Sequence, residues 1–340
     1  MEKDLKNYKV RTDLAIDEAI GNNENIIIKT KNYNEIKVTH VKVLKEIEEI
    51  NKKKGTYITI EFDDVTDYEN NKNVEKIFIE ELKNVLKKIK KTDYVLIVGL
   101  GNKTCTPDSI GPLGARKIIV TNHLYELGLL EEGFRRISVI EPGVTGTTGI
   151  ETQNIIKGIV NEIKPDLVIA IDSLASSSLD HVNKTIQITD AGISPGSGVG
   201  NKREEISSET LEIPVIAIGI PTVVDAATIV NDTIKYMYKH FAYNKKNYNN
   251  PINRLMINPN YLKENTEITK EDKNLLLGIV GTLTSNETKQ LISEVLSPIG
   301  YNLMVTPKEI DFQVNKISEL LSNGINNALN ENITNLWHFF

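Results

Sequence analysis

The chain has 340 residues, of which 40% are hydrophobic and 25% charged, and its formal net charge is −6. This composition fits a soluble globular protein that is long enough to bury a sizeable core, and it gives no basic footprint for nucleic acid. A single cysteine, Cys105, excludes an internal disulfide framework and a cysteine-ligated zinc site.

The N-terminal part predicts a polar arm followed by β structure. Residues 1–18 are polar and lack the apolar segment of a secretory signal, and no run of roughly 18 apolar residues predicts a membrane span, so we expect a cytoplasmic protein. Residues 22–66 look β-rich, with strand candidates at 26–28 and 57–62. Residues 73–90 place apolar side chains at helical spacing and predict an amphipathic helix.

From residue 93 onward, apolar runs alternate with helical patterns. Strands are expected at 94–99, 136–140, 167–171, 185–189 and 214–219. Helices are expected at about 109–128, 150–163 and 223–240. This alternation predicts a doubly wound α/β fold with a largely parallel sheet and helices on both faces.

The C-terminal part predicts an irregular excursion between helices. Residues 243–272 are rich in Asn, Lys and Tyr and have few apolar runs, whereas 273–300 and 308–330 follow helical spacing. Because no composition shift marks a firm boundary, we expect one α/β domain over residues 14–340.

Two aspartates lie at or after the ends of apolar strands. Asp108 follows the strand 94–99 in a short loop, and Asp172 directly follows the strand 167–171. Ligand sites of open α/β sheets gather at the carboxyl ends of strands, and two carboxylates there can share one proton and activate a water for hydrolysis. Each aspartate is equally placed to cap a following helix, so capping stays open as the alternative.

Gly143, Gly146 and Gly149 form a glycine-rich loop after the strand 136–140. Such a loop can offer backbone N–H groups to a substrate carbonyl or an anion, and we expect it to lie beside Asp172. The alternative is a loop that needs positive φ angles. A second glycine run, at 196–200, lacks the third glycine of a dinucleotide-binding pattern and the lysine context of a P-loop.

Several of these segments resemble the germination protease family of spore-forming bacteria. The resemblance rests on Thr-Pro-Asp108-Ser-Ile-Gly-Pro, on the segments 142–152 and 169–175, and on the segments 190–201 and 213–226. It extends over roughly residues 8–325. The family consists of endopeptidases that degrade small acid-soluble spore proteins during germination, so the resemblance implies such an activity in the spore core.

The resemblance also implies roles for individual residues. Asp108 and Asp172 occupy the positions of the proposed catalytic pair of an atypical aspartic peptidase. Members of the family are made as zymogens that process themselves. The resemblance therefore implies a cut between Asp13 and Leu14, with residues 1–13 as the pro-segment. It further implies a homotetramer, and a fold related to the hydrogenase-maturation proteases with an extra β-rich N-terminal part.

The chain departs from the family pattern at Asn122, Thr145, Ser173 and Ser177. The family has arginine in place of Asn122 and near Ser177, so positive charge is expected to be lost close to the site and specificity to be altered. We expect no cofactor and no metal. A metal-assisted peptidase and a non-catalytic anion-binding protein remain alternatives.

The metal alternative would draw on further side chains. Carboxylates near strand or helix ends are Glu141, Glu151, Asp190 and Asp225, and histidines between strands are His123 and His181.

Overall fold

The computed structural model describes residues 12–15, 24–46, 52–196, 204–249, 268–296, 303–331 and 333. These residues form two compact units. Within the described ranges, the larger unit comprises residues 12–176, 180–223 and 306 onward, and the smaller unit comprises 177–179 and 224–305.

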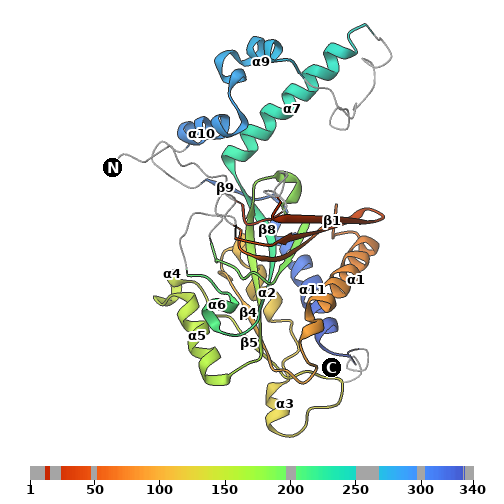
Figure 1. The fold of residues 1–340 in the computed structure, drawn as a ribbon, viewed down its shortest axis with the longest axis vertical. Helices are drawn as coiled ribbons and strands as arrows, with labels where there is room; N and C mark the ends of the chain where they lie inside the picture. Colours follow the sequence, from red (N-terminus) through yellow and green to blue (C-terminus); the bar gives the residue numbers. More distant parts are fainter. Residues whose placement is uncertain are drawn as a thin grey trace. The chain divides into compact units, whose positions relative to one another are not determined.

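A single large sheet forms the centre of the larger unit. Its strands in chain order are β1 (Ile26–Tyr33), β2 (Ile36–Val43), β3 (Gly55–Glu61), β4 (Val95–Gly99), β5 (Ile137–Ile140), β6 (Leu167–Ser176), β7 (Thr185–Thr189) and β8 (Val215–Asp225). They lie side by side in the order β1-β2-β3-β7-β8-β6-β4-β5 (Figure 1).

The sheet is mixed rather than largely parallel. β4 pairs in parallel with both β5 and β6. The pairs β1–β2, β2–β3, β3–β7 and β7–β8 are antiparallel. The prediction of a parallel sheet is therefore confirmed for β6-β4-β5 and wrong for the β1-to-β8 side. A parallel connection needs a crossover of about a dozen residues, whereas β1 and β2 are joined directly by a tight turn at Asn34-Glu35.

The helices of the larger unit differ from the predictions mainly in length. They are α1 (Tyr68–Val85), α2 (Ile110–Ala115), α3 (Asn122–Glu126), α4 (Thr145–Thr148), α5 (Thr152–Ile163), α6 (Ser208–Leu211) and α11 (Ile310–Leu329). The single helix predicted at 109–128 is wrong, since α2 and α3 replace it. None of the helices in the described ranges combines the length and apolar character needed to cross a membrane.

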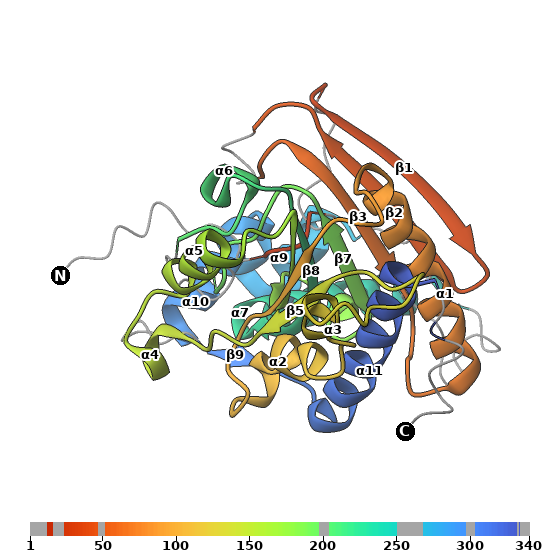
Figure 2. The same cartoon turned by 90° about the horizontal axis from the view of Figure 1, so that it is seen from below.

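Helices cover both faces of the sheet, as predicted (Figure 2). On one face, Phe78 of α1 and Leu321 of α11 belong to a buried cluster that includes Ile97 and Ile169 of the central strands. On the other face, Ile156 of α5 packs with the alternate side chains of β4 and β6. Because successive strand residues point to opposite faces, β4 and β6 are buried on both sides.

The smaller unit consists of α7 (Ala226–Lys246), α9 (Lys270–Leu277), α10 (Ser285–Leu296) and β9 (Met304–Val305). β9 pairs antiparallel with the last two residues of β8, and the carboxylate of Asp225 caps α7 by accepting the N–H of Ala227 at 2.7 Å. The predicted helix 273–300 is two helices, and residues 250–267 of the expected irregular excursion lie outside the described residues.

The contact between α1 and α11 gives a test of the packing. A Cβ at Gly324 of α11 would lie 2.3 Å from Cδ1 of Phe78. We expect Gly324→Ala to lower the free energy of unfolding by about 1–3 kcal/mol, because the added methyl group overpacks this contact.

Gly158→Ala in α5 is the matched control. A Cβ there meets nothing within 4 Å, so the higher helix propensity of alanine should stabilise the protein by about 0.8–1 kcal/mol. Urea unfolding gives the free energy of unfolding of both variants. Equal stabilisation of the two variants would contradict a tight contact between α1 and α11.

Candidate functional site

The carboxyl end of β4 lies beside the middle of β6. Gly99 of β4 pairs with Ile171 of β6, and the N–H of Leu100 extends the pairing by donating to the carbonyl of Ile171 at 2.8 Å. Asp172 is the next residue of β6, and Asp108 lies in the loop that leaves β4. The two aspartates singled out from the sequence therefore come to the same edge of the sheet.

The loop after β4 folds tightly around Asp108. The carboxylate Oδ2 of Asp108 accepts the N–H of Asn102 at 2.8 Å, and its carbonyl oxygen accepts the same N–H at 2.9 Å. Gly101 has a φ of 110°, and a Cβ there would lie 2.1 Å from the Asp108 carbonyl oxygen. The hydroxyl of Thr222 in β8 donates to the carbonyl of Pro107 at 2.6 Å, which ties the loop to a second strand.

Asp108 does not cap a helix. It is the last residue of a short 3₁₀ turn, Thr106–Asp108, and α2 begins at Ile110 with Ser109 as its N-cap and no side-chain capping bond. The capping alternative is wrong here because Ser109, and not Asp108, is the N-cap of α2.

Asp172 lies inside β6 rather than after it, and only 3% of its surface is exposed. Its Oδ1 accepts the N–H of Ser173 at 2.9 Å. The capping alternative is wrong for Asp172 as well, since β6 continues to Ser176 and no helix starts there. Removing a carboxylate from water into the middle of a buried strand is costly unless it has close hydrogen-bonding or charged partners.

The glycine-rich loop follows β5, and β4 lies between β5 and β6 in the sheet. That the loop lies beside Asp172 stays a prediction. Gly143 and Gly149 have φ angles of 74° and 71°, so positive φ accounts for both. Gly146 lies within α4, where a Cβ would meet nothing within 4 Å.

Residues 12–15 are packed into the larger unit. Leu14 is fully buried and Ala15 is 2% exposed, so these two residues of the predicted polar arm belong to the core. The N–H of Asp13 donates to the carbonyl of Ala175 at 3.0 Å, and the N–H of Ala175 donates to Oδ2 of Asp13 at 2.9 Å. The segment thus lies against the end of the strand that carries Asp172.

Two residues that contact this segment are not singled out by any pattern in the sequence. Lys52 Nζ and Gln187 Nε2 both donate to the carbonyl oxygen of Asp13, at 3.1 and 3.2 Å. Lys52 stands in a run of lysines and Gln187 in a strand of alternating residues. Only the fold brings both to the bond between Asp13 and Leu14.

Asn122 lies at the opposite edge of the sheet from the aspartates. It starts α3 and its side chain accepts from Nε of Arg136, which precedes β5. Since β5, β4 and β6 are parallel, residues before β5 and residues at the end of β6 lie at opposite ends of the strands. The expectation that this departure removes charge near the site is therefore wrong.

Four of the side chains weighed as metal ligands have other partners. Glu141 pairs with Arg116, Asp190 accepts the N–H of Thr56, Asp225 caps α7, and His181 lies 3.6 Å from Glu61. In the ranges that the structure describes, no three His, Cys, Asp or Glu side chains form a group able to hold a metal ion. Cys105 is exposed, and of the glycine run 196–200 only Gly196 is described.

Known proteins resemble this chain along almost its whole length. The model of the germination protease family matches residues 4–337. The germination protease of Geobacillus sp. (strain WCH70) is 46% identical over 357 aligned positions, which cover 97% of this chain and 96% of that protein. The germination protease of Bacillus subtilis (strain 168) is 45% identical over 356 positions, which cover 98% and 96%. The chain therefore belongs to the germination protease family.

Proposed function

We propose that this protein is an endopeptidase that degrades small acid-soluble spore proteins during spore germination, with Asp108 and Asp172 as its acid–base pair. The proposal rests on one observation: the paired strands β4 and β6 bring both aspartates to the same side of the sheet, where β4 ends. Membership of the germination protease family supports the peptidase activity.

The proposed reaction is attack of a water on the scissile carbonyl. One carboxylate, ionised, takes a proton from the water as the water attacks. The other carboxylate, protonated, polarises the carbonyl and then helps to protonate the leaving amine. Two carboxylates at close range favour a shared proton, because both cannot ionise cheaply.

Maturation is the second part of the proposal. The chain is made as a zymogen in the spore core and cuts itself between Asp13 and Leu14, and the active form is a homotetramer. Because Leu14 is fully buried, this bond becomes accessible only when residues 12–15 leave their place against β6.

The first test replaces each aspartate with its isosteric amide. Asp108→Asn and Asp172→Asn should each lower turnover of a small acid-soluble spore protein by about 10²-fold or more, since a positioned acid or base is removed. Asp63→Asn, which changes an exposed aspartate after β3, is the control and should keep full turnover. Near-normal turnover by either correctly folded site variant would rule out the pair.

The second test addresses metal assistance. Exhaustive chelation should leave turnover unchanged, because the proposed mechanism activates the water with carboxylates alone. Metal analysis of the purified protein accompanies the assay. Stoichiometric bound metal, together with activity that returns when metal is restored, would favour a metal-assisted peptidase that uses the same carboxylates as ligands.

The third test follows maturation by N-terminal sequencing. The full-length chain should be weakly active and should become active as it is cut after Asp13. Acidification should speed the cut if a carboxylate must take up a proton to form the working pair. The Asp172→Asn chain serves as the control and should stay uncut. A fully active chain that still begins at residue 1 or 2 would contradict a pro-segment.

A further inference from the structure

The loop that carries Asp108 is tied to a strand that is not its neighbour in the sheet. The loop leaves β4, yet the hydroxyl of Thr222 in β8 donates to the carbonyl of Pro107, the residue directly before Asp108, at 2.6 Å. In the sheet, β6 lies between β4 and β8. The loop therefore reaches across β6, the strand that carries Asp172.

The hydroxyl of Thr222 comes from a face of β8 that is otherwise apolar. Ile218 and Ile220 alternate along the strand and belong to the buried cluster that also includes Ile110 of α2. Two positions further on, the same face carries Thr222, which is only 1% exposed. Valine has nearly the same shape as threonine and would suit an apolar face, so packing alone does not account for a hydroxyl here. The Pro107 carbonyl, which accepts from it, does.

The part of β8 around Thr222 is itself fixed by hydrogen bonds. The carbonyl of Thr222 accepts the hydroxyl of Thr306 at 2.8 Å. The carbonyl of Pro221 accepts the N–H of Asn183 at 2.7 Å, and the side chain of Asn183 donates to Gln313 of α11 at 2.7 Å. The donor that meets the loop is thus held in place on both sides.

Two kinds of contact act on the loop. The N–H of Asn102 bonds to the carboxylate and the carbonyl of Asp108 at 2.8 and 2.9 Å, which fixes the shape of the loop. Gly111 and Thr222 fix its place on the sheet, since a Cβ at Gly111 would lie 2.4 Å from a carbonyl oxygen of β6 and the hydroxyl reaches in from β8. Removing the hydroxyl would keep the shape and release one of the two anchors.

We propose that Thr222 is a positioning residue, whose hydroxyl sets the place of Asp108 relative to Asp172 and to the scissile carbonyl of a substrate. This role rests on the proposed function, because the place of Asp108 matters only if its carboxylate is an acid or a base in the reaction. Thr222 acts through Pro107 and does not touch the substrate. A shift of a reacting group by about 1 Å can cost on the order of 10²-fold in rate.

The test removes the hydroxyl and then restores it. Thr222→Val should lower kcat for digestion of a small acid-soluble spore protein by about 10-fold and leave KM nearly unchanged, because the Pro107 carbonyl loses its donor and the loop shifts. Thr222→Ser keeps the hydroxyl and should recover most of the turnover. Circular dichroism shows whether each variant is folded, and Thr222→Ala replaces Thr222→Val if the valine chain does not fold.

The pH profile separates positioning from a loss of stability. Two carboxylates at close range titrate in two steps that lie far apart, and the steps approach one another as the carboxylates separate. The two limbs of the kcat/KM profile should therefore move toward each other in Thr222→Val, by about half a pH unit or more in sum. A variant that is only less stable keeps both limbs in place.

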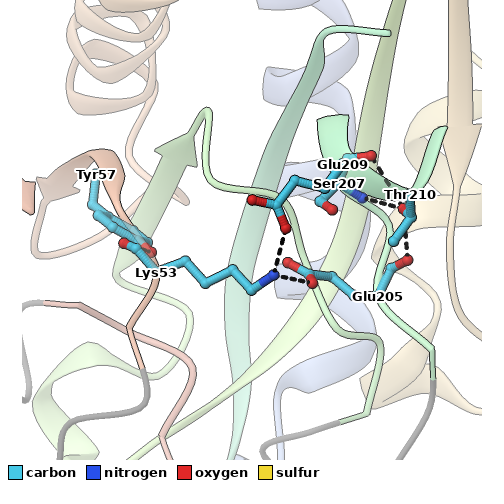
Figure 3. A network of polar contacts seen from close by, with 6 residues as sticks. All are labelled: Lys53, Tyr57, Glu205, Ser207, Glu209 and Thr210. Atoms are coloured by element: carbon cyan, nitrogen blue, oxygen red, sulfur yellow. Dashed lines mark hydrogen bonds and ion pairs between the residues drawn. The ribbon is translucent and has the colours of Figure 1, made fainter. Parts of the chain in front are cut away.

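Thr210→Val is the matched control (Figure 3). The hydroxyl of Thr210 likewise donates to a backbone carbonyl, that of Glu205 at 3.0 Å, and accepts the N–H of Ser207 at 3.0 Å. Glu205 in turn bonds to Lys53 at 2.6 Å. Thr210 precedes the first residue of β8, whereas Thr222 lies near its last, so Thr210→Val should keep kcat and both limbs of the pH profile.

Hydrogen exchange gives a reading that does not depend on activity. The amide of Asn102 should exchange faster in Thr222→Val and not in Thr210→Val, because only the first substitution releases the Asp108 loop. The amide of Ser207 should show the reverse, since its acceptor is the Thr210 hydroxyl.

The outcomes distinguish this role from the proposed function. Equal kcat losses in Thr222→Val and Thr210→Val, a Thr222→Ser chain as slow as Thr222→Val, or limbs of the pH profile that do not move would overturn the role of Thr222. Normal digestion by Thr222→Val, together with loss of digestion in Asp108→Asn, would overturn that role and leave the proposed function intact. Digestion that survives Asp108→Asn would reject the proposed pair itself.

Discussion

The parallel pairing of β4 with β6 is the interaction on which the proposed site depends. All residues of β4 and all of β6 except Ser173 are buried, and the pairing runs one residue beyond β4 through Leu100 and Ile171. Gly111 of α2 closes this end of the pair, since a Cβ there would lie 2.1 Å from the carbonyl of Leu100 and 2.4 Å from that of Ile171. Without this close approach, the loop that holds Asp108 could not return to the edge where Asp172 lies.

The antiparallel part of the sheet gives the same unit a second set of polar groups. Gln187 comes from β7, and Lys52 comes from the chain just before β3, whereas both aspartates belong to the parallel part. Lys52 and Gln187, which contact Asp13, therefore come from the antiparallel side of the sheet, whereas Ala175, which also contacts Asp13, shares β6 with Asp172.

The position of Arg136 changes how the sequence departures are understood. Its guanidinium lies 4.1 Å from the ring centroid of Tyr94 and 4.5 Å from that of Tyr125, and it pairs with Glu126. Asn122 accepts from the same guanidinium. Asn122 therefore accommodates the neighbouring Arg136. Its difference from the family's arginine concerns the packing of α3 and not the place where Asp108 and Asp172 lie.

The sequence by itself determined the buried strands and the two segments, after β4 and within β6, that carry the aspartates. The bounds of β4, β5 and β7 agree with the prediction to within a residue, because apolar runs of that length bounded by turn residues have few other solutions. The motifs around Asp108 and Asp172 also identified the family correctly. These features are local, and local patterns can be seen in one stretch of chain.

Only the tertiary structure decided which strands are neighbours and which distant residues meet. A strand pattern shows that a segment is buried, but it does not show whether its partner runs parallel or antiparallel, so the β3–β7 pairing was not foreseen. The burial of Leu14 and the approach of Lys52 and Gln187 to Asp13 depend on contacts between residues far apart in the chain. Hydrogen-bond partners at that separation leave no periodicity in the sequence, because nothing in the local spacing records what a side chain meets after folding.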